Sequence, residues 1–161
     1  MSASLKTLLV VVSYHHGNTE KVARAFAKVL DAQVRSPKQT RPEELQEYDL
    51  VGLGSGIYDE KHHTDLLDFA DSLPQVIDKS AFIFSTGSMI GEVQDPKFHM
   101  PLKDKLKSKG YKIVGEFSCK GFNTNSFLRH FGGLNKGRPN EQDLKNAEGF
   151  AVNLKSKILG Q

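Results

Sequence analysis

The sequence has one cysteine, no long apolar run and no dense cluster of positive charge. The single thiol, Cys119, excludes an intramolecular disulfide and suggests a reducing, cytoplasmic setting. No apolar stretch approaches the roughly 20 residues that a membrane-spanning helix needs, so we expect no membrane span. The formal net charge is +3 and the basic residues are scattered. That pattern argues against nucleic acid as a partner.

What is present is ordinary for a globular protein. The chain has 161 residues, of which 38% are hydrophobic and 25% charged. A chain of this length can bury about two-thirds of its unfolded surface in one core. Because no internal repeat, linker or low-complexity tract is visible, we expect residues 1–161 to form a single domain.

Strand-like and helix-like segments alternate along the chain. A continuous aliphatic run, typical of a strand buried on both faces, predicts a strand over residues 8–12. Further strands are predicted over residues 33–35, 49–56, 81–86 and 112–119. Apolar residues at helical spacing predict helices over residues 22–30, 66–73, 102–109 and 141–158. Asn18 or Thr19 is the expected cap of the first helix, and Asn140 that of the last. This alternation predicts a parallel sheet with helices on both faces.

Ligands of such sheets bind outside the carboxyl ends of the strands. Three loops leave those ends, at residues 13–19, 55–63 and 85–99, and all are rich in glycine and hydroxyl residues. The first, within "VVVSYHHGNTEKVARAF", combines a glycine, polar side chains and a helix N-terminus, which is a favourable place for a phosphate. A capped turn with surface histidines explains the same residues, so this loop alone leaves both interpretations open.

The first loop resembles the signature of the flavodoxin-like family, in which hydroxyl-x-hydroxyl-Gly-Asn-Thr holds the phosphate of FMN. Gly17, Asn18 and Thr19 match its last three residues. Tyr14 and His16 stand where the family usually has Ser or Thr, but both can donate hydrogen bonds to a phosphate. The resemblance implies a flavodoxin-like three-layer sandwich, with a five-stranded parallel sheet of order 2-1-3-4-5.

The resemblance extends to the other two loops. "VGLGSGIYDEKHH" is similar to the third-strand loop of this family, and in particular to that of menaquinone-dependent protoporphyrinogen oxidases, which lies beside the isoalloxazine ring. "FSTGSMIG" would then serve the ribityl chain and the pyrimidine edge. By this carry-over the cofactor-binding residues are Ser13, Tyr14, His15, His16, Gly17, Asn18, Thr19, Ser55, Gly56, Ile57, Tyr58, Ser85, Thr86, Gly87 and Ser88.

The family implies an FMN-binding flavoprotein that transfers electrons through non-covalently bound FMN. The alternative is an FMN-dependent oxidoreductase acting on a quinone or a porphyrinogen-type substrate, and a third possibility is a binding module without flavin. The partner would be a redox protein or a small redox substrate, and the oligomeric state stays open. No residue stands out as a catalytic acid or base. The positive net charge departs from the usual acidity of electron carriers in this family.

Other motifs are weaker. "GLGSG" lacks the third glycine of a dinucleotide-binding fingerprint, because Ile57 stands there, and Leu53 occupies a glycine position of a nucleophile elbow. His62 and His63 do not have zinc-site spacing, so we expect solvated side chains at a helix start, with a role near the flavin left open. Residues 120–139 are a long loop with a short helix expected at 126–131, either a packed excursion or a flap.

Overall fold

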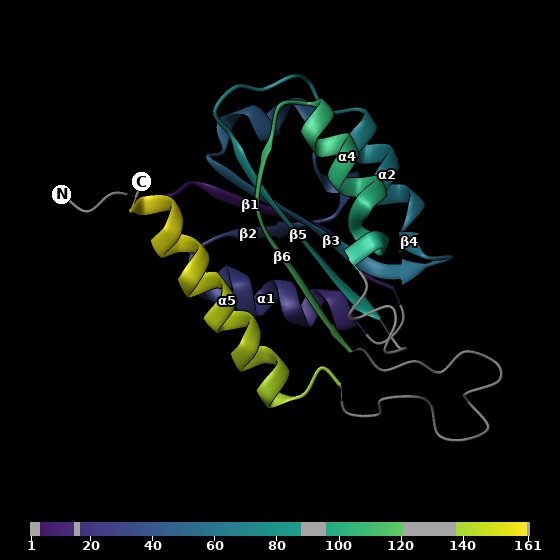
Figure 1. Cartoon of the computed structure of the whole chain (residues 1–161), viewed down its shortest axis with the longest axis vertical. Helices are drawn as coiled ribbons and strands as arrows, with labels where there is room; N and C mark the ends of the chain where they lie inside the picture. The colour runs from purple at the N-terminus through teal and green to yellow at the C-terminus, as the bar shows by residue number, and fades with distance from the viewer. Residues whose placement is uncertain (1–3, 15–16, 88–95, 121–137, 161) are drawn as a thin grey trace.

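The computed structural model describes residues 4–14, 17–87, 96–120 and 138–160, and its centre is a parallel sheet (Figure 1). The parallel strands are β1 (Thr7–Val12), β2 (Gln33–Arg35), β3 (Leu50–Tyr58), β5 (Ser80–Gly87) and β6 (Lys112–Lys120). They lie in the order β2-β1-β3-β5-β6. Counted among the five parallel strands alone, this order is 2-1-3-4-5, so the predicted fold and the predicted strand order are confirmed. Among the described residues, no helix has the length and apolar character to cross a bilayer.

A short sixth strand was not predicted. β4 (Lys61–His62) pairs antiparallel with the end of β3, at Ile57 and Tyr58. The turn between them consists of Asp59 and Glu60, which have φ angles of 54° and 65°. Two successive residues in the left-handed region reverse a strand with the twist that a tight hairpin needs. The second strand-end loop is thus held as a hairpin against the sheet.

The four predicted helices are present, and short 3₁₀ helices accompany them. The helices are α1 (Asn18–Leu30), α2 (Thr64–Asp71), α4 (Met100–Ser108) and α5 (Glu141–Leu159); the 3₁₀ helices are η1 (Pro37–Gln39), η2 (Pro42–Glu47) and η3 (Pro96–His99). Asn140 caps α5 as predicted, since its side chain accepts from the Asp143 N–H. The prediction for α1 was wrong. Its cap is Gly17 at φ 62°, and Asn18 and Thr19 lie inside the helix.

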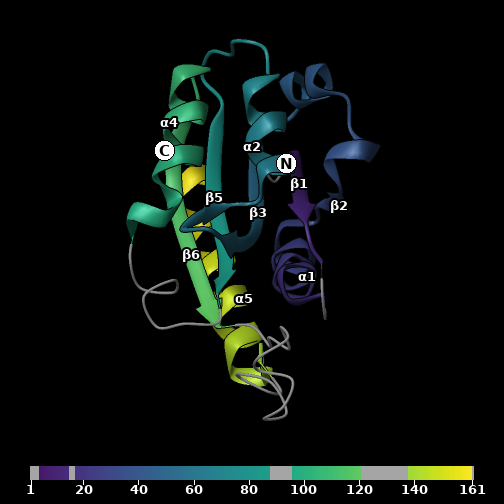
Figure 2. The same cartoon turned by 90° about the vertical axis from the view of Figure 1, so that its right-hand side faces the viewer.

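The sheet separates two cores of different composition. Helices α1 and α5 lie side by side over one face, and α2 and α4 cover the other (Figures 1 and 2). The α1/α5 side is aromatic: the Phe26 ring is fully buried and lies 5.0 to 5.7 Å from the rings of Phe82, Phe84, Phe117 and Phe150. The α2/α4 side is mostly aliphatic, built from leucines, valines and isoleucine.

Two glycines of β3 make room for two of these rings. Gly52 pairs with Phe82 and Gly54 with Phe84 across neighbouring strands. A Cβ atom on Gly54 would stand 2.2 Å from a ring carbon of Phe84, and one on Gly52 would stand 2.5 Å from Phe82. Both rings therefore lie directly over the backbone of β3, which no residue with a side chain would permit without movement.

Candidate functional site

The three strand-end loops meet at one edge of the sheet. The hydroxyl oxygens of Thr19, in the first turn of α1, and Thr86, near the end of β5, are 2.9 Å apart and buried. In such a pair one hydroxyl donates to the other, and the second O–H remains able to donate elsewhere. This contact joins the first loop to the third across 67 residues of sequence.

The first loop turns into α1 through a left-handed glycine. A Cβ atom on Gly17 would meet nothing within 4 Å, so the space beside this residue is open. The Ser13 hydroxyl accepts from the Glu20 N–H at 3.1 Å, and the first main-chain bond of the helix runs from the Lys21 N–H to the Gly17 carbonyl. The loop therefore places a helix N-terminus beside open space, which is the arrangement that anions favour.

An aromatic cluster joins the first loop to the second. The His63 ring lies 5.1 Å from the ring of Tyr14 and 5.2 Å from that of Tyr58. The Tyr14 hydroxyl donates to Asp65 at 3.1 Å, and this hydrogen bond raises the Tyr14 pKa, with help from the negative charge of the carboxylate. Tyr58 is half-buried, and its ring covers the α-carbon of Gly56.

Two predicted site residues direct their side chains into the protein. The Ser55 hydroxyl donates to the Gly56 carbonyl at 2.6 Å and accepts from the His63 N–H at 2.9 Å. The Ser85 hydroxyl lies 2.7 Å from Nε2 of His99 and 3.0 Å from the Ser118 hydroxyl. Both serines are fully buried, which leaves mainly their backbone groups to face a ligand.

A partly buried polar cluster, which was not predicted as a unit, lies under this edge on the α2/α4 side. We call it the His99 cluster; its members are His62, Ser85, His99, Lys103, Glu116 and Ser118. Nδ1 of His99 donates to Glu116 at 3.1 Å, which leaves Nε2 as the acceptor for a serine hydroxyl. Lys103 contacts the other carboxylate oxygen of Glu116 at 3.1 Å.

His62 corrects the expectation of solvated histidines. It lies on β4, is 1% exposed, and donates from Nε2 to the Phe84 carbonyl at 3.0 Å. Among the described residues, nothing forms a hydrogen bond with its Nδ1. Burial, and secondarily the charge of nearby His99, lowers the His62 pKa to about 3, so its ring is neutral at pH 7. His63 does stand at a helix start, where its Nδ1 accepts from the Asp65 N–H and caps α2.

We expect this histidine to make the protein sensitive to acid. The folded-state pKa of about 3 lies below the unfolded value of about 6.5, so the unfolded state binds the proton more readily. Its contribution is intact above pH 6.5 and is lost as pH falls toward 3, at up to about 1.4 kcal/mol per pH unit. Urea unfolding should show about 2 kcal/mol of this loss by pH 5. His62→Gln, which can still donate to Phe84, should remove this part of the slope; equal slopes in both proteins would contradict the assignment.

The part of the chain that carries these loops also matches a known protein family. The family model described as a flavodoxin domain matches residues 9–121, which include all three strand-end loops. The chain belongs to the flavodoxin family. A protein of Methanocaldococcus jannaschii, itself uncharacterised, is 45% identical over 150 residues, covering 93% of this chain and 98% of that protein.

Solved flavodoxins share the fold. Oxidised flavodoxin 2 from Bacillus cereus aligns with a TM-score of 0.73 at 20% identity, covering 94% of this chain and 99% of that one. A flavodoxin from Fusobacterium nucleatum bound to flavin mononucleotide aligns with a TM-score of 0.66 at 14% identity, covering 95% and 99%. At these identities the likeness concerns the fold alone.

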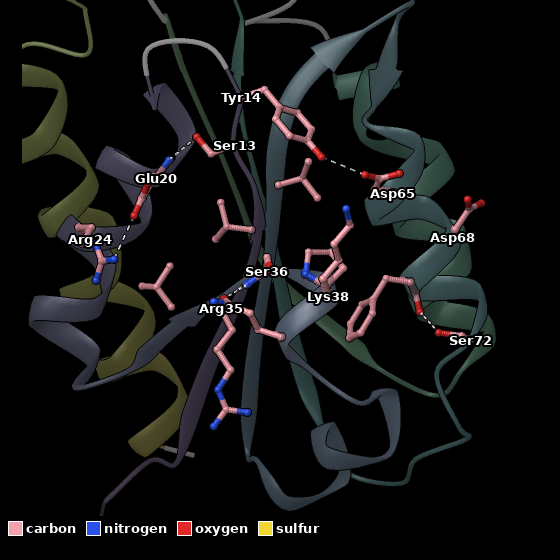
Figure 3. A pocket seen from close by; sticks show the side chains of 16 residues that line it. Ser13, Tyr14, Glu20, Arg24, Arg35, Ser36, Lys38, Asp65, Asp68 and Ser72 are labelled. Atoms are coloured by element: carbon pink, nitrogen blue, oxygen red, sulfur yellow. Dashed lines mark hydrogen bonds and ion pairs between the residues drawn. The ribbon is translucent and has the colours of Figure 1, made fainter.

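A cavity of about 890 Å³ opens beside the first loop of this flavodoxin-family chain (Figure 3). Ser13 and Tyr14 line one side, and Asp65 and Asp68 of α2 line another. Lys38, from η1, projects between them (Figure 3). Among the described residues, none of the second or third loop lines this cavity, whereas residues 34–39 at and after β2 do. The cavity therefore lies toward β2 rather than between the three loops.

Some predicted site residues lie outside the described part of the chain. They are His15, His16 and Ser88. The helix predicted at 126–131 lies outside it as well. The members of the His99 cluster on β6 did carry a sequence signal: Glu116 and Ser118 alternate with Phe117 and Cys119, which places two polar side chains on one face of the strand.

Proposed function

We propose that this flavodoxin-family protein binds FMN non-covalently at the strand-end loops and transfers electrons through it, as one domain over residues 1–161. The observation that carries the proposal is the Thr19–Thr86 contact, because it brings the phosphate-type loop and the third loop to one place. The FMN-bound relative from Fusobacterium nucleatum supports the choice of cofactor.

The first loop suits the phosphate. The first turn of α1 directs main-chain N–H groups outward, and the open space at Gly17 lets a bulky anion approach them. The Thr19–Thr86 pair keeps one hydroxyl proton available to a phosphate oxygen. Ser13 already accepts from the Glu20 N–H, so it would share its hydroxyl between that group and the ligand.

The second and third loops suit the ring. Ile57 and Tyr58 provide apolar and aromatic surface, and the backbone from Ser85 to Gly87 provides polar groups at the adjacent strand end. FMN itself supplies the redox chemistry when bound, while the protein grips, orients and partly shields it. Because the Ser55 and Ser85 hydroxyls are engaged internally, the main chain of these two residues would make the contacts.

The visible spectrum of purified protein tests the proposal. A flavin spectrum, with FMN released on denaturation and identified by chromatography, is the expected result. A colourless protein that fails to retain added FMN on gel filtration would contradict it. Turnover then separates the two redox roles: a carrier passes electrons to protein acceptors, whereas saturable reduction of a small quinone would indicate an oxidoreductase.

Replacing Tyr58 should weaken FMN binding. In Tyr58→Ala the stacking and the apolar cover are both lost, so we expect a loss of about 1–3 kcal/mol in binding free energy and a changed flavin spectrum. Fluorescence titration with FMN measures the affinity, and Tyr58→Phe, which keeps the ring, is the control. Unchanged affinity and an unchanged spectrum in the alanine variant would place Tyr58 away from the ring.

FMN affinity should fall as pH rises if His15 or His16 contacts the phosphate. A phosphate dianion favours the charged imidazole and raises its pKa, so binding is tighter while histidine is protonated. The effect should appear above pH 6.5, and below about pH 6 it should flatten because the phosphate takes up its own proton.

Riboflavin, which lacks the phosphate, is the matched control and should show much less slope. His15→Ala and His16→Ala would identify the side chain, at about 1.5–3 kcal/mol for one lost charge-assisted hydrogen bond. Parallel pH profiles for both ligands, unaffected by either variant, would assign the phosphate to main-chain groups and Thr19.

A further inference from the structure

The His99 cluster is a polar group where the α2/α4 core is otherwise aliphatic. Three neighbouring strands carry serines in register here, with Ser55 of β3 beside Ser85 and Ser85 beside Ser118. His99 is 3% exposed and fills the space next to them. Buried polar groups of this kind cost stability relative to hydrocarbon, so their position directly below the ligand loops calls for a functional reason.

The geometry of Ser85, His99 and Glu116 resembles a nucleophile, a base and an orienting carboxylate. A nucleophile must reach its substrate, however, and Ser85 is 0% exposed. The arrangement is therefore suited to holding a proton rather than to attacking a substrate.

Only one nitrogen of the two histidines is equipped to gain a proton. When His99 is neutral, its Nε2 accepts from Ser85 or Ser118; when His99 is charged, the same nitrogen donates to either hydroxyl, because a hydroxyl can both donate and accept. Nδ1 of His62 has no such partner among the described residues, so a proton there would be buried and unsatisfied.

We propose that His99 takes up one proton from solvent when the cofactor at the strand ends is reduced and gains negative charge. The inference rests on the proposed function and deepens it. The electrons come from the donor that reduces the cofactor, and the proton binds at Nε2 of His99, entering past the half-buried Ser118. No bond between heavy atoms forms or breaks.

The groups around His99 act on its pKa in opposite directions. Glu116 on β6 favours the charged imidazole, whereas Lys103 on α4 opposes it. The ring of His62 on β4 lies 5.0 Å away and is neutral at pH 7. Burial outweighs Glu116 and lowers the His99 pKa, so the ring is neutral before reduction. A new negative charge raises that pKa, and Ser85 is adjacent in sequence to Thr86, a proposed ligand contact.

The midpoint potential of the FMN-loaded protein, measured against pH, tests this. One additional proton for two electrons adds about 30 mV per pH unit to the slope, since each pH unit is a tenfold change in proton concentration. We expect the wild type to show this increment over a window of pH and His99→Gln to lack it. Equal slopes in the two proteins would overturn the inference.

Two further variants sharpen the result. His62→Gln replaces a neutral ring that takes up no proton near pH 7, so the increment should persist. Glu116→Gln removes the favourable carboxylate and should move the window to lower pH. If His62→Gln abolishes the increment while His99→Gln keeps it, the assignment to His99 is wrong.

Histidine ring ¹⁵N spectra of the wild type decide the matter without a variant that must fold. The His99 ring should be neutral at pH 7 with oxidised FMN and charged after reduction with dithionite. A ring that stays neutral in both states overturns the inference while leaving FMN binding intact. Failure to retain FMN on gel filtration would instead overturn the proposed function, and the inference with it.

Discussion

Phe26→Ala is expected to lower the free energy of unfolding by about 3–5 kcal/mol. The Phe26 ring is 0% exposed and stands at the centre of the aromatic core, in edge contact with Phe82, Phe84 and Phe117. Removing the ring leaves a cavity between the sheet and the helices that the surrounding residues cannot fully fill. The lost transfer free energy of the ring and the cost of the cavity therefore add. Urea unfolding with the m-value checked for constancy measures the loss.

Two controls bracket this result. Phe26→Leu keeps most of the volume and should cost less than half as much. Ile77→Ala deletes an apolar side chain that is 82% exposed and should change stability by less than about 0.5 kcal/mol. A loss below about 1 kcal/mol in Phe26→Ala would mean that the layer between α1 and the sheet is not closely packed.

Gly54→Ala should be nearly as damaging, at about 3 kcal/mol, although it adds only a methyl group. The new Cβ would stand 2.2 to 2.5 Å from three atoms of the Phe84 ring, and that ring is held by Phe26 on its other side. Either the ring or strand β5 must move. Because the Phe84 carbonyl accepts from His62, movement of β5 also disturbs the edge that carries the candidate site.

The same substitution elsewhere provides a matched control. Gly149 lies in α5 with nothing within 4 Å of an added Cβ, so Gly149→Ala should stabilise the protein by about 0.4–1 kcal/mol. Adding Phe84→Leu to Gly54→Ala relieves the clash, and the double variant should be at least about 1 kcal/mol more stable than the sum of the single effects predicts. Strict additivity would show that the clash is not with Phe84.

The parallel sheet could be predicted from the sequence because short strand-like segments alternate with helical patterns along the chain. β4 could not, for a local reason. Tight hairpins usually carry glycine or asparagine where φ is positive, but this turn uses Asp59 and Glu60. The following "KHHT" has no apolar alternation, so nothing in it indicates that His62 is buried.

The loops of the candidate site could be predicted from the sequence, but the buried side-chain contacts beneath them could not. Glycine and hydroxyl residues after three strands indicate which edge of the sheet binds a ligand, whichever way the individual side chains point. Whether a serine faces a ligand or the interior depends on its partner, and the partner of Ser85 is His99, 14 residues further along the chain. Propensity and spacing carry no information about such a pairing, since it arises only when η3 packs over the sheet.

The uneven distribution of rings gives the two sides of the sheet different spectroscopic properties. Methyl groups of the core cluster that contains Phe26, Phe82 and Phe84, such as those of Val22 and Leu154, should experience aromatic ring currents and resonate far from ordinary methyl positions. The leucines under α2 and α4 have fewer rings near them. Loosening of either layer can therefore be followed separately by NMR, without introducing a label into the molecule.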